Sequence, residues 1–238
     1  MLSLEMPEFQ FRAVDLEPRA AGSNKKGPRD RGPRPDRLSG RLLLGTPVAI
    51  PLTAAAAGDD KETVEFLKAR AAQSDFYLVT MACSFQPKEE EPFEQAWLYV
   101  HLDRSDGAKD PRPTAYSMRP LKTSREIQQS NSIKLGADFK LMGVGFETGG
   151  GRDEKTTRED VLVQGFNELS PEPFWQFNAR DGAPLDGSYR MALVVEAPKS
   201  VGARVAVNLE ATVRHTFLKL IPYRSSFDGR ESISINLP

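Results

Sequence analysis

The stretch ARVAVNLEATVRHTF at positions 203–217 alternates between apolar and polar side chains, and it decides the fold class. One parity holds Ala203, Val205, Val207, Leu209, Ala211 and Val213, and the other holds Arg204, Asn208, Glu210, Thr212 and Arg214. Because a β-strand points successive side chains to opposite faces, this pattern predicts a strand with one buried and one wet face. At about 3.3 Å per residue it would span roughly 50 Å, which predicts a bulge, a bend or a change of partner strand.

The same period of two recurs along the chain. It predicts strands at residues 8–13, 42–52, 76–85, 93–102, 137–146, 160–167, 189–197 and 231–237, with weaker patterns at 114–121 and 173–178. Prolines at 47 and 51 mark 42–52 as an edge strand, because proline cannot donate a ladder hydrogen bond. Both parities of 76–85 and 93–102 are apolar, which predicts central strands covered on both faces.

Turn and helix signals agree with an antiparallel architecture. Four Asp-Gly pairs, which favour tight reversals between strands, occur at 106–107, 181–182, 186–187 and 228–229. Asp59-x-x-Glu62 predicts a capped helix over 60–72, and Thr123-x-x-Glu126 predicts one or two further helical turns. The fold class is therefore predicted as all-β, a mostly antiparallel β-sandwich of immunoglobulin-like or jelly-roll-like type with one or two short helices in connections.

A basic segment divides the predicted N-terminal strand (1–16) from the predicted β-sandwich domain (42–238). Residues 17–41 are rich in Pro, Gly and Arg and almost lack apolar side chains, which predicts a flexible linker or loop. Residues 18–41 carry eight basic side chains and two acidic ones in a chain whose net charge is −1. The alternative is an arm that binds nucleic acid through Lys25, Lys26, Arg29, Arg31, Arg34 and Arg37. The segment has no aromatic side chain for base stacking, so the linker is favoured.

Composition removes several chemistries. The 238 residues contain one cysteine and two histidines, which excludes an internal disulfide framework and cysteine-rich metal sites. Cys83 shares its parity with Met81 and Phe85, so we expect a buried and inert thiol. His101 and His215 have no nucleophile or carboxylate partner within a local motif. No catalytic residue, metal ligand or cofactor is predicted, although a catalytic site assembled from distant loops around either histidine stays open.

The aromatic cluster Phe174, Trp175 and Phe177 follows Pro171 and Pro173. It has two interpretations. On the surface these rings would form a partner-binding anchor, and inside they would close one end of the sandwich. Packing is favoured, because large aromatic side chains usually serve the core.

The absence of catalytic motifs leads to a functional hypothesis. We expect a non-enzymatic recognition or assembly module that binds another protein or forms a homo-oligomer through the loops and edges of a rigid sandwich. The alternatives are a nucleic-acid-binding or virion-type jelly-roll protein that uses residues 18–41, and an enzyme built from distant loops. The sequence contains no apolar run long enough for a membrane-spanning helix and no signal-peptide pattern, which predicts a soluble, cytoplasmic protein.

Overall fold

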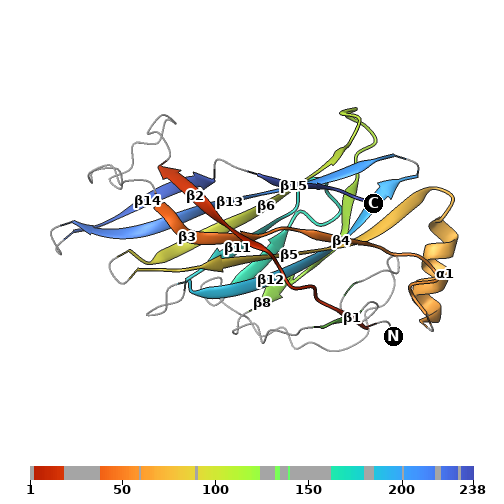
Figure 1. The fold of residues 1–238 in the computed structure, drawn as a ribbon, viewed down its shortest axis with the longest axis horizontal. Coiled ribbons are helices and arrows are strands. Elements are labelled where there is room, and N and C mark those ends of the chain that lie inside the picture. The colour runs from red at the N-terminus through yellow and green to blue at the C-terminus, as the bar shows by residue number, and fades with distance from the viewer. Residues whose placement is uncertain are drawn as a thin grey trace.

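A computed structural model describes residues 3–18, 38–58, 60–88, 91–123, 132–134, 139, 162–179, 185–199, 201–217, 221–229 and 232–238. Within these residues the chain is mostly antiparallel β-structure with one helix, which confirms the predicted all-β sandwich (Figure 1). The strands are β1 (Ser3–Glu5), β2 (Phe11–Pro18), β3 (Leu38–Gly45), β4 (Val48–Pro51), β5 (Ser74–Phe85), β6 (Phe93–Arg104), β7 (Thr114–Arg119), β8 (Lys122–Thr123), β9 (Ser132–Lys134), β10 (Val163–Phe166), β11 (Phe174–Asn178), β12 (Gly187–Pro198), β13 (Ala203–Phe217), β14 (Ile221–Gly229) and β15 (Ile233–Asn236), and the helix is α1 (Lys61–Arg70).

Thirteen of these strands form one continuous sheet that folds over on itself. Its order is β7-β12-β5-β3-β2-β14-β13-β6-β11-β10-β8, with β15 added beside β13 and β4 beside β5. The inner faces of β5 and β12 meet those of β6, β11 and β13 across the main core. Fully buried side chains such as Met81, Met191, Leu98, Trp175 and Val207 fill this core, so alternation in sequence becomes burial in space.

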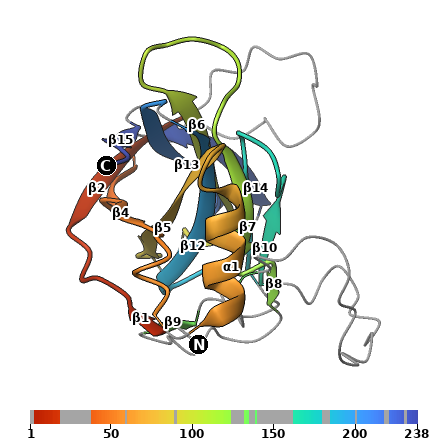
Figure 2. The same cartoon turned by 90° about the vertical axis from the view of Figure 1, so that its right-hand side faces the viewer.

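A second, smaller core covers the outer face of β5 and β12. Phe76 and Val194 on these strands pack with Leu67 of α1 and with Phe139, all of them buried. Residues 76–85 are therefore covered on both faces, as predicted. Figure 2 shows α1 lying over one end of the sandwich. The helix is capped by Asp60, whose Oδ1 accepts a hydrogen bond from the Thr63 amide at 3.3 Å.

The prediction that residues 93–102 are covered on both faces is wrong. β6 buries Leu98, Val100 and Leu102, whereas Trp97 and Tyr99 lie half-buried on the outer face. The outer aromatic side chains of this layer pack across strands instead of under a second layer. The Tyr99 ring lies 5.5 Å from Phe174, and Phe174 stacks on Phe166 at 4.8 Å. The aromatic side chains on the outer face of β6 therefore belong to a row of rings that pack across neighbouring strands.

β13 behaves as its length predicted. Its register against β6 shifts between Thr212 and Val213, which marks a bulge or irregularity. On its other side β13 pairs first with β15 and then with β14, so it changes partner along its length.

Two boundary predictions need correction. The predicted edge strand 42–52 is in fact two strands, β3 and β4. β3 lies inside the sheet between β2 and β5. Of the two, only β4 has a single described partner, which is β5. The prolines that suggested an edge lie at 47 and 51, after β3 has ended. β14 was not predicted, and it contains the Asp228-Gly229 pair expected to form a turn. β14 is held by its hydrogen-bonded pairing with β13, although its own sequence did not predict a strand.

Several predicted features lie outside the described residues. These are the six basic residues Lys25, Lys26, Arg29, Arg31, Arg34 and Arg37, most of the strand predicted at 137–146, and the helix after Thr123. Strands β2 and β3 extend into the two ends of the predicted linker, since β2 ends at Pro18 and β3 begins at Leu38. Thr123 itself belongs to strand β8.

Candidate functional site

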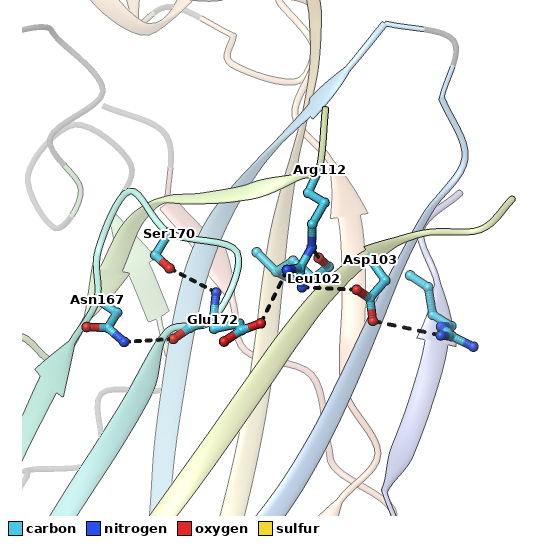
Figure 3. A network of polar contacts seen from close by, with 7 residues as sticks. Leu102, Asp103, Arg112, Asn167, Ser170 and Glu172 are labelled. Carbon is cyan, nitrogen blue, oxygen red and sulfur yellow. Dashed lines mark hydrogen bonds and ion pairs between the residues drawn. The ribbon is translucent and has the colours of Figure 1, made fainter. Parts of the chain in front are cut away.

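The loops at the carboxyl end of β6 form the most elaborate polar cluster among the described residues. We call this region the loop end, and it comprises the β6–β7 loop (105–113), the β10–β11 turn (167–173) and the adjoining ends of β6 and β13. Antiparallel pairing of β6 with β11 and β13 brings these segments together from distant parts of the sequence. Figure 3 shows the side chains that join them.

Arg112 connects three segments of the loop end. Its Nη2 lies 3.0 Å from Asp103 Oδ1, and its Nη1 lies 3.2 Å from Glu172 Oε1 (Figure 3). Arg112 Nε also donates to the Leu102 carbonyl at 3.3 Å. The second carboxylate oxygen of Asp103 faces Arg204 Nη2 at 3.8 Å. One guanidinium therefore ties the β6–β7 loop to the strand it leaves and to the β10–β11 turn.

A second ion pair orders the tip of the β6–β7 loop. Arg104 donates from Nε and Nη2 to the two carboxylate oxygens of Asp106, at 2.9 and 2.6 Å. The Asp106 carboxylate also accepts a hydrogen bond from the Ala108 amide at 3.1 Å. The hydrogen bond from Arg104 is the main cause that lowers the pKa of Asp106 to about 2. This carboxylate is therefore an ion-pair partner and not a proton donor near neutral pH.

The backbone of the β10–β11 turn is held on both sides. The Leu169 amide donates to the Ala115 carbonyl at 2.8 Å, and the Ala115 amide donates to the Ser170 carbonyl at 3.0 Å. Asn167 Nδ2 donates to the Glu172 carbonyl at 3.1 Å, and the Glu172 amide donates to Ser170 Oγ at 3.1 Å (Figure 3). These bonds leave the turn little freedom to change shape.

Leu169 is the exceptional residue of this turn. Its φ is +63°, in the left-handed region that a leucine adopts at a cost of about 1–2 kcal/mol. Its side chain is 69% exposed, against 41% for Phe11, the other exposed large hydrophobic residue of the described chain. The turn thus presents an apolar side chain to solvent in a strained conformation that the surrounding hydrogen bonds enforce.

A different polar cluster, which we call the clamp, lies at the opposite end of β6. Arg41 is 4% exposed and its guanidinium lies 2.7 Å from Glu91 Oε2. It also donates to the carbonyls of Gln86 and Glu91 and lies over the Phe93 ring, 5.0 Å from its centroid. Desolvation lowers the pKa of Arg41, against the opposing effect of Glu91. The clamp fastens β3 to the β5–β6 hairpin.

The described residues contain no group of three or more His, Cys, Asp or Glu side chains able to hold a metal ion. Cys83 is a fully buried free thiol whose pKa is raised by desolvation, so it is poorly suited to act as a nucleophile. His101 lies half-buried on the outer face of β6. His215 lies on β13, and its side chain is outside the described residues.

The structure separates the predicted aromatic anchor into two sets. Trp175 and Phe177 are fully buried in the main core, and Trp175 Nε1 donates to the Pro120 carbonyl at 2.9 Å. Phe174 points to the outer face and belongs to the aromatic row with Tyr99 and Phe166. The packing interpretation therefore describes Trp175 and Phe177, and neither side chain is available to a partner.

Sequence reasoning missed Arg112 and Glu172, two of the residues that build the loop end. Arg112, Glu172 and Asp103 come from three segments whose proximity depends on strand pairing. The run Ser-Pro-Glu-Pro at 170–173 is a readable turn signal, but the positive φ of Leu169 has no sequence signature.

No protein-family model matches the sequence, and no curated protein matches it. The solved structures that resemble this chain include the following two. One is described as a pore forming protein, with 8% sequence identity and a TM-score of 0.37, over 98% of this chain and 94% of that one. The other is the NetB toxin of Clostridium perfringens in its membrane inserted form, with 9% identity and a TM-score of 0.34, over 95% of this chain and 94% of that one.

One description names a pore forming protein and the other a toxin in its membrane inserted form, and by this comparison the predictions of a recognition or assembly module and of a cytoplasmic location are wrong. Those predictions rested on the absence of catalytic motifs and targeting signals. Such an absence does not distinguish a recognition module from other functions that need no such motif. Among the described residues, no helix is sufficiently long and apolar to cross a bilayer. These remote similarities do not transfer a function, so the proposal below rests on this chain's own residues.

Proposed function

We propose that this protein acts on lipid bilayers and contacts them with the loop end. The observation that carries the proposal is Leu169, a 69% exposed leucine held at a φ of +63°. Strain of this kind persists where the surrounding structure enforces it, and it clusters at functional sites. An apolar side chain at the tip of a braced turn can enter the boundary between headgroups and acyl chains without unfolding of the turn.

The charges around Leu169 suit an interfacial position. Arg112 is neutralised by Asp103 and Glu172, so the ion-pair network that braces the turn carries little unbalanced charge toward a membrane. Arg204 completes this balance as the second ion-pair partner of Asp103. Lys109 adds an exposed cation at the same end, and its contact with phosphate headgroups would accompany burial of the leucine.

The energetics favour several copies acting together. Burial of the exposed part of one leucine contributes on the order of 1.5 kcal/mol, which is roughly a tenfold gain in partitioning. That is too little for stable attachment by one molecule. Copies joined in an oligomer would multiply the gain, which makes the proposed bilayer contact depend on a homo-oligomer.

Vesicle flotation tests the proposal. The wild-type protein should float with phosphatidylcholine vesicles, with or without phosphatidylserine, and Leu169→Gly should lower its partitioning at least about tenfold, because every copy in an oligomer loses its leucine. Glycine accepts a positive φ, so the variant should keep the free energy of unfolding within about 1 kcal/mol of wild type. Phe11→Ser is the matched control, because it removes the other exposed large side chain from strand β2 and should leave flotation unchanged.

Two results would overturn the proposal. One is a wild-type protein that floats with neither kind of vesicle. The other is a folded Leu169→Gly variant that partitions as wild type does, because the exposed leucine would then have no part in membrane contact.

A further inference from the structure

The N-terminal strand β1 is attached to the rest of the molecule in an unusual way. It pairs with β9 through three register pairs, Ser3 with Lys134, Leu4 with Ile133 and Glu5 with Ser132. These two strands form a separate sheet that does not join the thirteen-stranded sheet. A two-stranded ladder of this length is marginally stable by itself in water, so the three register pairs contribute little to holding β1 on β9.

A strap of five residues, 6–10, joins β1 to β2 without belonging to either strand. Figures 1 and 2 show it running along the outside of the sandwich to the end where β1 and α1 lie. The strap is fixed at its β2 end, because the Thr46 amide donates to the Gln10 carbonyl at 3.0 Å. A Cβ placed on Gly45 would lie 3.0 Å from Phe9 Cβ, which shows close packing there.

The other end of the strap begins at Met6. Met6 is only partly buried where it packs against the smaller core. Pro7 has no amide hydrogen to donate, and it biases Met6 toward an extended backbone. An extended strap of this length spans up to about 17 Å, so rotation near Pro7 would carry β1 well away from its own β9.

We infer that β1 is an exchangeable arm, which pairs with β9 of a second copy of this chain. Exchange between identical copies rebuilds the same three register pairs, so the closed and exchanged forms differ little in contacts. The choice between them is then set by protein concentration relative to the effective concentration of the tethered arm. This inference goes beyond the proposed membrane contact and is independent of it.

Cysteine cross-linking between two single variants tests the exchange. Leu4→Cys and Ile133→Cys place thiols at register partners, where antiparallel Cα separations suit a disulfide. Mixing the two variants and oxidising them should produce a covalent dimer on a non-reducing gel. The native Cys83 is buried, so it adds no background. The matched control pairs Leu4→Cys with Ser234→Cys, an exposed site on β15, and should cross-link far less.

Further measurements complete the test. The double variant Leu4→Cys/Ile133→Cys should form its disulfide within one chain at low concentration and between chains at high concentration. Removal of residues 1–5 should abolish the oligomer detected by light scattering, while the far-ultraviolet circular dichroism of the main sheet persists. Equal cross-linking in the control pair, or an oligomer that survives the truncation, would overturn the inference. If the double variant formed no disulfide at any concentration, the β1–β9 pairing on which the inference rests would be wrong.

Discussion

The two ends of β6 carry polar clusters that differ in how they stabilise the protein. At the clamp, one guanidinium that is 4% exposed meets one principal carboxylate. At the loop end, several ion pairs link the exposed loops, and Glu172 and Asp106 each have side chains 56% exposed. Water screens the second cluster, whereas at the clamp the guanidinium is buried and only the carboxylate, 34% exposed, meets water. The comparison teaches that burial, and not the number of ion pairs, sets the contribution of charge to stability.

The largest expected effect belongs to the clamp. Glu91→Ala should lower the free energy of unfolding by about 3 kcal/mol, because it leaves the buried Arg41 guanidinium without its carboxylate. Arg41→Met removes the buried charge together with its desolvation cost, so it should lose only about 1 kcal/mol. Urea denaturation measures both, with Glu65→Ala on the exposed face of α1 as a control expected to change by less than about 0.5 kcal/mol.

The order of the two clamp variants is the decisive result. If Arg41→Met proves as damaging as Glu91→Ala, then packing of the arginine stem and its contact with Phe93 outweigh the uncompensated charge. The distinction drawn between the two ends would then lose its electrostatic basis.

The loop end should respond more weakly to the same treatment. Arg112→Met breaks two ion pairs at once, yet we expect a loss of no more than about 1 kcal/mol, because both carboxylates can be hydrated. Urea denaturation again measures the change, and hydrogen exchange at the Ala115 and Leu169 amides reports whether the turn has loosened. A loss as large as that of Glu91→Ala would contradict the comparison.

The smallest effect should follow the protonation of Asp106. Its folded-state pKa of about 2 lies below the ordinary value of 3.8, so ionised Asp106 contributes stability above that ordinary value. The contribution is lost as the pH falls through the folded pKa. A titration of the Asp106 carboxyl carbon by NMR should show a midpoint near 2 that moves toward 3.8 in Arg104→Gln. An unchanged midpoint in this variant would separate the pKa shift from the ion pair.

The sequence predicted the fold class because periodicity of two is a local property of each strand. The pattern of residues 203–217 predicted both β13 and the irregularity within it, and the Asp59-x-x-Glu62 pattern located α1 to within a residue of its cap. The outer face of β6 was predicted wrongly. In a sequence pattern, an aromatic side chain counts as apolar whether it fills a core or packs against a ring on the next strand. Tyr99 packs against Phe174 on the next strand.

The loop end was beyond sequence reasoning for a related cause. Arg112 is nine residues from Asp103 and sixty from Glu172, and nothing local distinguishes these side chains from other surface charges. Leu169 reads as an ordinary turn residue until strand pairing places its amide against the Ala115 carbonyl. Functional prediction failed for the same reason, because it relied on motifs that were missing and could not weigh geometry that was not yet visible.

By itself the sequence determined which residues alternate, where the chain can turn and which metal and disulfide chemistries are excluded, since these follow from neighbours along the chain and from composition. Only the tertiary structure decided which strands pair, that Arg41 is buried while Arg112 is only partly buried, that Leu169 is strained, and that β1 stands apart with β9. Those outcomes depend on contacts between residues far apart in the chain, and their energies exist only once the backbone has closed around them.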